Sequence, residues 1–274
     1  MKEIRVTRRN TWFQRLETMR RNRQKRTSEG LFVVDSVKAL NLLTAHPNWT
    51  IDALVYPHPR ALSDWARTML ATSRASWHVA VAPELFAELT ERTEPPELFA
   101  VAHIPSDDIG RIPIPSHRPP LMMVIDRPVS PGNLGTMVRS ADAFGVDGIV
   151  VFGHAADLYA PETVRASLGT LFTVPVVRMY AWADFDGWIA ALRQTHSNAQ
   201  LIGSSAQEGV FPSALDLTRP TVLVLGNETA GMSRRFMERV DNCLSIPMRG
   251  AASSLNIACA ATAILYEVAR QRLL

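Results

Sequence analysis

The sequence predicts an α/β protein of two domains, and three observations support this fold class. Short apolar runs rich in β-branched residues, typical of buried strands, alternate with stretches whose apolar residues recur at helical spacing. Five prolines in residues 105–120 interrupt the alternation and predict an extended linker that cannot form a helix. The alternation then restarts at residue 121. With 274 residues, of which 47% are apolar, the chain can bury two cores.

Residues 1–104 are predicted to form the smaller α/β domain. Residues 12–19 carry apolar side chains at helical spacing and basic ones elsewhere, so they predict an amphipathic helix with a cationic face. The remaining elements are expected as strands at 31–35, 51–56 and 77–81, and as helices at 36–45, 59–71 and 83–90.

Residues 121–274 are predicted to form the larger domain around a mainly parallel sheet of six strands. The expected strands are 121–126, 148–152, 172–177, 200–203, 221–225 and 243–247. Helices are expected from the glycine-rich loop at 132–135 to residue 144, and at 161–168, 185–194 and 255–272. In such sheets ligands bind beyond the carboxyl ends of the strands, so the polar loops there are the candidate site.

Composition excludes several classes of protein. The start of the chain is charged, and neither a secretory segment nor an apolar run long enough for a membrane span occurs. Cys243 and Cys259 are expected to be reduced, buried thiols of a cytosolic protein. No CxxC, HExxH or histidine cluster is present, so no metal site is expected.

The net charge of +3 conceals a basic amino-terminal segment. Residues 1–30 contain ten Lys or Arg against three Glu, which leaves −4 on the remaining residues. This segment indicates either contact with phosphates or only a solvated helix face, and charge alone leaves both open. If it contacts the phosphates of a nucleic acid, affinity should fall steeply with salt. The candidate phosphate-binding residues in it are Arg8, Arg9, Arg20, Arg21, Arg23 and Arg26.

Asn133 and Arg139 are the first candidate pair. Asn133 lies in a Gly-Asn-Leu-Gly loop that opens a helix, where backbone N–H groups can approach an anion. Arg139 follows within that helix, and the two side chains could bracket one phosphate or hydroxyl. The alternative is a helix cap plus a surface arginine. The loop is neither GxGxxG nor a Walker loop, which disfavours a dinucleotide or nucleoside triphosphate and hence an oxidoreductase.

Glu228, Ser254 and Asn256 are the other polar candidates. Glu228 follows a strand end and is either an ordinary loop carboxylate, a catalytic one or an anchor for Arg139. Ser254 and Asn256 precede the last helix, where such residues also serve as ordinary caps. The small residues that begin this helix suit close packing in the core or at a dimer interface.

Three blocks together resemble the motifs of the SpoU (TrmH-type) RNA ribose 2′-O-methyltransferases of the SPOUT superfamily. They are Pro131-Gly132-Asn133-Leu134-Gly135 through Arg139-Ser140-Ala141, Val224-Leu225-Gly226-Asn227-Glu228 with Gly231, and Ile246-Pro247-Met248 through Ser254-Leu255-Asn256 to Glu267. The segment from Val164-Arg165 to Phe172 is similar to the family's helix-to-strand connection.

The resemblance implies a trefoil-knotted domain at 121–274, S-adenosylmethionine as cofactor and a homodimer whose site borrows residues across the interface. It implies functional roles for Asn133, Arg139, Glu228, Ser254 and Asn256, with Arg139 activating the ribose hydroxyl. It also implies cofactor contacts around Gly203, Ser204, Gly226, Ile246, Met248 and Leu255. RNA contact is implied for Arg165 and for the six candidate arginines of residues 1–30.

Residues 1–104 are similar to the α/β RNA-binding fold shared with some ribosomal proteins, on the phrase Ser28-Glu29-Gly30-Leu31-Phe32-Val33-Val34-Asp35, although the family often has Glu where Asp35 stands. This plan implies a large-subunit ribosomal RNA substrate. Thiostrepton-type resistance methyltransferases share it, so a role in antibiotic resistance is open. The alternatives are a tRNA ribose methyltransferase or a non-catalytic ribosome-assembly factor.

Overall fold

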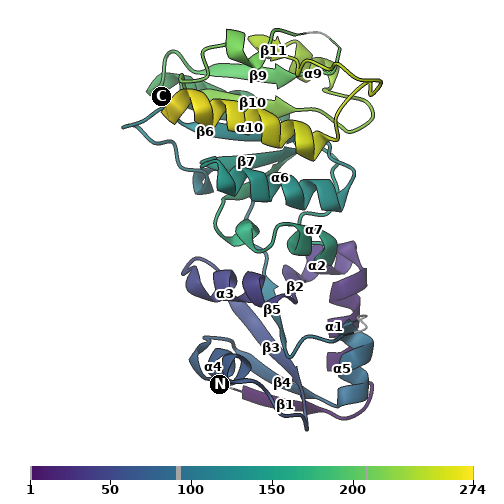
Figure 1. Cartoon of the computed structure of the whole chain (residues 1–274). Coiled ribbons are helices and arrows are strands. Elements are labelled where there is room, and N and C mark those ends of the chain that lie inside the picture. Colours follow the sequence, from purple (N-terminus) through teal and green to yellow (C-terminus); the bar gives the residue numbers. More distant parts are fainter. Residues whose placement is uncertain (1, 91–93, 208, 274) are drawn as a thin grey trace. The chain divides into compact units, whose positions relative to one another are not determined.

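A computed structural model of the chain describes residues 2–90, 94–207 and 209–273 (Figure 1). The chain divides into two compact units. The first contains Met1–Pro105 and Asp157–Phe172, and the second contains Ser106–Ala156 and Thr173–Leu274. The mixed α/β fold predicted from the sequence is confirmed.

The first unit is built on a five-stranded sheet in the order β1 (Lys2–Val6), β4 (Trp77–Val81), β3 (Ile51–Pro57), β5 (Phe99–His103), β2 (Leu31–Val34). The strand β5 runs antiparallel to both of its neighbours, and the other pairs are parallel. Helices α1 (Thr11–Arg21) and α5 (Pro83–Thr90) bury Phe13, Leu16 and Phe86 in the core on one face. Figure 1 shows α3 (Val37–Ala45) and α4 (Asp64–Thr72) on the other side.

Several boundaries in this unit differ from the sequence prediction. The strands β1 and β5 and the helix α2 (Arg23–Glu29) were not predicted. The helix α4 begins at Asp64 rather than 59, because Ser63 caps it and prolines precede it. The charged strand β1 escaped prediction because it carries only two large apolar residues, Ile4 and Val6.

The second unit contains a six-stranded, wholly parallel sheet. Its order is β11 (Asn242–Leu244), β9 (Gln200–Ser204), β10 (Thr221–Leu225), β6 (Leu121–Asp126), β7 (Gly148–Phe152), β8 (Val176–Met179). The central strands β10, β6 and β7 are buried along their whole length, as parallel strands covered on both faces must be. Figure 1 shows α6 (Pro131–Ala143) and α10 (Ile257–Leu273) on one face of this sheet. The core on the other face includes residues of α8 (Trp182–Thr195) and α9 (Arg234–Met237).

Residues 105–120 are more than a spacer. Ile109–Arg111 forms one 3-10 turn capped by Asp108, and Ile112 is buried in the core of the second unit. A Cβ on Gly148 would lie 2.4 Å from the side chain of Ile112, so the strand passes this residue at close range. The expectation of a helix-free, extended linker is therefore corrected.

The segment Asp157–Phe172, although it lies between β7 and β8, packs within the first unit. It contains α7 (Pro161–Ala166) and a 3-10 turn at Thr170–Phe172, where the sequence had predicted the start of a strand. The rings of Tyr159 and Phe172 pack on Phe32 and Trp49, and the indole N–H of Trp49 donates to the Phe172 carbonyl at 3.1 Å. Aromatic packing thus holds Phe172 outside the sheet of the second unit.

Candidate functional site

The site begins with a tight turn directly after β10. Asn227 and Gly231 exchange two backbone hydrogen bonds of 2.9 and 3.0 Å. The side-chain oxygen of Asn227 accepts from the N–H groups of Thr229 and Ala230 inside the turn. A Cβ on Gly226 would lie 2.3 Å from the Met232 backbone nitrogen, so only glycine fits where the turn closes on the strand. The turn therefore presents Glu228 in a fixed position.

The carboxylate of Glu228 binds the start of α6. It accepts hydrogen bonds from the backbone N–H groups of Val129 at 3.0 Å and Ser130 at 3.1 Å. The side-chain amide of Asn133 donates to it at 3.3 Å. Burial of the carboxylate acts to raise the pKa of Glu228, but the hydrogen bonds, including those from Val129 and Ser130, outweigh it and hold the pKa below its ordinary value of 4.5. Glu228 is thus an ionised acceptor at the amino end of a helix, where negative charge is favoured.

Asn133 and Asn256 continue this network. The side-chain amide of Asn256 donates to the Asn133 side-chain oxygen at 3.0 Å. The oxygen of Asn256 accepts from the N–H of Ala258 at 2.9 Å and so caps α10. The side chains of Glu228, Asn133 and Asn256 are therefore joined by hydrogen bonds. Asn133 lies 95 positions from Glu228 and 123 positions from Asn256 in the sequence.

A cavity of about 480 Å³ lies beside this network in the second unit. Of the residues predicted to surround a cofactor, five line it: Ser204, Gly226, Ile246, Met248 and Leu255. Ser254 and Glu228, predicted as functional polar residues, line it too. Gly203 does not line the cavity, and a Cβ there would lie 2.4 Å from the Met232 Cε. Sequence reasoning missed further lining residues, among them Ser205, Met232, Met237, Ile257 and Ile264.

Arg139 is the one predicted catalytic residue that the structure leaves apart. It is exposed on α6, and the described part of the chain offers it no hydrogen bond or ion pair. Six residues after Asn133 along a helix, its side chain points away from that of Asn133 by roughly 120°. The carboxylate of Glu228 is committed to Val129, Ser130 and Asn133, so the possibility that Glu228 anchors Arg139 is not realised within this chain.

Two of the predicted RNA-binding arginines are buried and paired inside the first unit. The Arg20 side chain is 5% exposed and binds Asp35 at 2.7 Å, and the Thr90 carbonyl accepts from it at 3.2 Å. The Arg26 side chain is also 5% exposed and binds Asp157 at 2.6 Å. Neither guanidinium can reach an RNA phosphate without breaking a buried ion pair, so we do not retain these two residues among the proposed RNA contacts.

The other predicted RNA-binding arginines remain accessible to differing degrees. Arg8 is exposed, Arg9 pairs with Glu88, and Arg21 pairs with Glu17 at 3.1 Å on the helix surface. Arg23 is partly buried. The Arg165 side chain is 41% exposed, and its Nη1 lies 3.4 Å from the Asp35 Oδ2.

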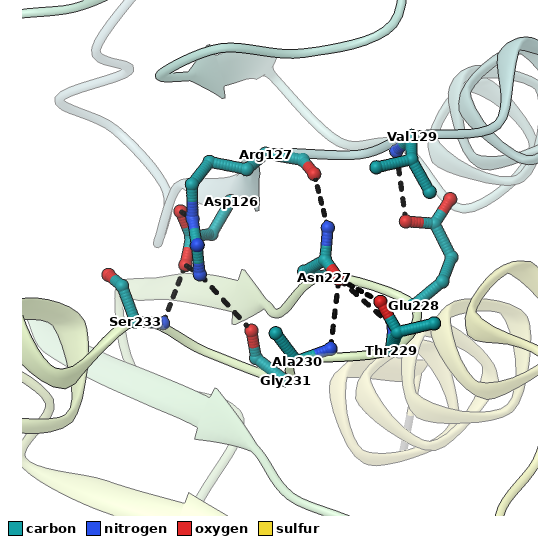
Figure 2. A network of polar contacts seen from close by, with 9 residues as sticks. All are labelled: Asp126, Arg127, Val129, Asn227, Glu228, Thr229, Ala230, Gly231 and Ser233. Carbon is teal, nitrogen blue, oxygen red and sulfur yellow. Dashed lines mark hydrogen bonds and ion pairs between the residues drawn. The ribbon is translucent and has the colours of Figure 1, made fainter.

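A second set of contacts at this site was missed by sequence reasoning. Figure 2 shows Asp126 and Arg127 at the end of β6 facing the turn after β10. Asp126 accepts from the Ser233 N–H at 2.7 Å, and the Arg127 carbonyl accepts from the Asn227 side-chain amide at 2.7 Å. Only the position of Asp126 at a strand end could have indicated a role.

Other predicted features have mixed outcomes. Cys243 is partly buried, and its burial raises the pKa of the thiol, but Cys259 is exposed, contrary to expectation. Among the described residues no three His, Cys, Asp or Glu side chains gather as metal ligands would. None of the described helices has the length and apolar character needed to cross a bilayer.

Comparison with known proteins supplies the family. Residues 120–266 match the SpoU rRNA Methylase family, and residues 10–100 match the SpoU L30e-like domain. The chain is 45% identical over 270 residues to the 23S rRNA (uridine(2479)-2′-O)-methyltransferase of Streptomyces viridochromogenes, covering 98% of this chain and 93% of that protein. It is 28% identical over 246 residues to the 23S rRNA (guanosine(2553)-2′-O)-methyltransferase RlmP of Bacillus subtilis, covering 90% and 91%.

Solved structures agree with this match. The SpoU methyltransferase AviRb of Streptomyces viridochromogenes, in complex with S-adenosylmethionine, aligns with a TM-score of 0.91 over 97% of this chain and 99% of that one at 45% identity. An S-adenosylmethionine-bound rRNA methyltransferase from Sinorhizobium meliloti aligns with a TM-score of 0.85 at 27% identity, over 99% of both chains. The predicted family is confirmed: the chain belongs to the SpoU rRNA methylase family.

Proposed function

We propose that this protein transfers a methyl group from S-adenosylmethionine to a ribose 2′-hydroxyl of 23S ribosomal RNA. The observation that carries the proposal is the hydrogen-bonded set Glu228, Asn133 and Asn256 at the edge of the cavity. These residues come from three separate family motifs, and the fold joins them in one place. The substrate follows from the two relatives named above, which both modify that RNA and match nearly the whole chain.

The cavity suits the cofactor. Its volume of about 480 Å³ lies within the usual range for small-molecule sites. The apolar side chains of Ile246, Leu255 and Ile257 can cover an aromatic base, and Ser204, Ser254 and backbone groups can bind its polar edges. When bound, S-adenosylmethionine supplies a methyl group attached to a sulfonium sulfur, and the sulfur is a good leaving group because it departs as a neutral thioether. We propose that the chain passing through this region forms the family's trefoil knot.

The residues of the chain position and polarise the ribose. Glu228, which is ionised and accepts from three donors, fixes the start of α6 and orients the Asn133 amide. Asn256 donates to the Asn133 side chain and accepts from the backbone of α10, so it connects Asn133 to the start of that helix. Holding the 2′-oxygen in line with the reacting carbon supplies much of the barrier reduction.

Arg139 binds the phosphate next to the ribose and polarises the 2′-hydroxyl, whose proton passes to that phosphate or to water. A guanidinium holds its proton too tightly to act as the base. Because Arg139 lies apart from Glu228 in its own chain, we propose that it serves the site of a second copy in a homodimer. The exposed Tyr266, 61% accessible on α10 beside α6, is a suitable residue for that interface.

We propose that residues 1–104 form the RNA substrate-binding domain, residues 105–120 the connection and residues 121–274 the methyltransferase domain, working in the cytoplasm. The accessible arginines at positions 8, 9 and 21 are the phosphate contacts retained from the sequence prediction, joined by Arg23 and Arg165.

The test is transfer of labelled methyl from S-adenosylmethionine into separated ribosomal RNA, ribosomal particles and tRNA, all lacking native modification. Label in large-subunit ribosomal RNA, naked or in particles, mapped to a ribose, is the expected result. Label in tRNA alone would keep the chemistry and overturn the substrate. If none of the three is labelled while S-adenosylmethionine still binds, the chain is a non-catalytic RNA-binding factor.

A further inference from the structure

The turn after β10 is held from outside by Asp126, the last residue of β6, and by Arg127, which follows it. Asp126 is buried, with 1% of its surface exposed. Its carboxylate accepts from the Arg127 guanidinium at 2.9 Å (Nε) and 3.1 Å (Nη2). It also accepts from the backbone N–H of Ser233 at 2.7 Å. One buried carboxylate thus connects the end of β6 to the chain just beyond the turn.

Arg127 reaches the turn at two more points (Figure 2). Its carbonyl accepts from the side-chain amide of Asn227 at 2.7 Å, and its Nη2 donates to the Gly231 carbonyl at 3.5 Å. Its own N–H donates to the Phe152 carbonyl at the end of β7 at 2.9 Å. Asn227 and Gly231 are the two ends of the turn, so Arg127 contacts both of them.

The backbone of Arg127 is in the left-handed region, at φ 52°. Residues other than glycine adopt this conformation at a cost, and they keep it where the surrounding contacts fix it. Here the conformation directs the carbonyl toward Asn227 while the side chain turns back to Asp126. The strained backbone and the bidentate ion pair therefore serve the same contact with the turn.

The contact between Arg127 and the turn matters because the turn forms part of the cavity and carries Glu228. Residues 226–232 form one wall of the cavity, and Glu228 leaves from the same turn toward α6. A loop with mainly local hydrogen bonds opens easily unless other elements hold it. Asp126 and Arg127 supply contacts from a neighbouring strand, and neither residue lines the cavity.

We propose that Arg127 is a positioning residue which, with Asp126 and Asn227, clamps the turn at 227–231 and so fixes the cofactor pocket wall and Glu228 for methyl transfer. The role in transfer rests on the proposed function. The role in ordering the turn does not, and the two can be measured separately.

The experiment compares Arg127→Gly with Arg118→Ala in the full chain. Glycine adopts positive φ freely, so Arg127→Gly removes the guanidinium contacts to Asp126 and Gly231 without adding backbone strain, while the carbonyl that accepts from Asn227 remains. Arg118 is a matched control, because it also makes a bidentate ion pair to a nearly buried aspartate, Asp147, and lies away from the cavity. Arg127→Lys keeps the charge but loses the planar fork, so it should rescue partly.

The first readout is hydrogen–deuterium exchange of the backbone amides at 227–233 without cofactor. Arg127→Gly should raise exchange there about tenfold, and Arg118→Ala should not. Unchanged exchange in Arg127→Gly, or an equal rise in Arg118→Ala, overturns the clamp.

The second readout is binding of S-adenosylmethionine by calorimetry, together with the single-turnover rate of methyl transfer. Arg127→Gly should weaken cofactor binding about tenfold and slow the transfer further, since misplaced groups lose rate steeply. Faster exchange with unchanged binding and rate overturns the positioning role. If the unmodified chain itself binds no cofactor, the proposed function fails, and the exchange result still decides whether the turn is clamped.

Discussion

Glu228 shows how a single ionised side chain can be built into both the fold and the site. Its two oxygens accept from the N–H groups of Val129 and Ser130 and from the Asn133 amide. Glu228→Gln keeps the size of the side chain but loses the charge and one acceptor. At pH 7 we expect the substitution to lower the free energy of unfolding, measured in urea, by about 1–2 kcal/mol, the lower value suiting its partial exposure.

The pH dependence of that loss follows from the pKa of Glu228, which lies below its ordinary value of 4.5 in the folded chain. A carboxyl with a lowered folded pKa contributes stability that is complete above its unfolded pKa and lost as pH falls through the folded value. The difference between the two proteins should therefore be constant from pH 7 to about 5 and shrink below pH 4.5. A difference that stays constant down to pH 3 would contradict this account.

At the scale of elements, the break between α1 and α2 decides which arginines are buried. Asn22 ends α1 and caps α2, its side chain accepting from the Lys25 N–H at 3.1 Å. Arg20 and Arg26 lie on either side of this break and turn toward Asp35 and Asp157. The break changes the direction in which the following side chains point. A single helical period continued through it therefore does not predict which arginines face inward.

The same comparison shows which features a sequence can predict. The strands β6, β7 and β10 were predictable because uninterrupted apolar runs mark parallel strands buried on both faces. Asn133 and Glu228 could be singled out because each lies in the first loop or helix turn after such a strand. Arg127 was not, since its role depends on a positive φ and on contacts 100 residues away. Phe172 was misassigned because its aromatic partners, Phe32 and Trp49, lie far away from it in the sequence.

Arg26→Ala tests the structural role assigned to the buried pair. It leaves the Asp157 carboxylate, 12% exposed, without its charged partner and removes the donor to the Met19 and Arg20 carbonyls. We expect a loss of about 3–5 kcal/mol in the stability of the first unit, with faster amide exchange in the Asp157–Phe172 segment.

Arg21→Ala provides the control for that substitution. Its ion pair with Glu17 lies on the surface of α1, so its loss should cost about 0.5 kcal/mol or less. If the two variants lost equal amounts of stability, the buried ion pair of Arg26 would contribute no more to the fold than the surface ion pair of Arg21.

At the scale of the whole molecule, the proposed site is incomplete in one chain. Both carboxylate oxygens of Glu228 accept hydrogen bonds from its own protomer, and Arg139 is exposed on another side of α6. In a twofold symmetric dimer each interface surface meets its own copy, so a residue that leaves one site can enter the other. Arg139→Lys should then retain RNA binding while losing most turnover, because lysine lacks the fork that holds phosphate and hydroxyl together.

Mixed dimers decide whether Arg139 acts across the interface. Chains carrying Arg139→Lys and Glu228→Gln, co-expressed with different tags and purified as a heterodimer, would contain one site with both substitutions and one site with neither. That heterodimer should show about half the activity of the unmodified dimer, whereas each substituted homodimer stays weak. If Arg139 instead serves the site of its own chain, every site in the heterodimer carries one substitution and activity does not return. Activity no higher than that of the homodimers would therefore place Arg139 and Glu228 of the same chain in one site.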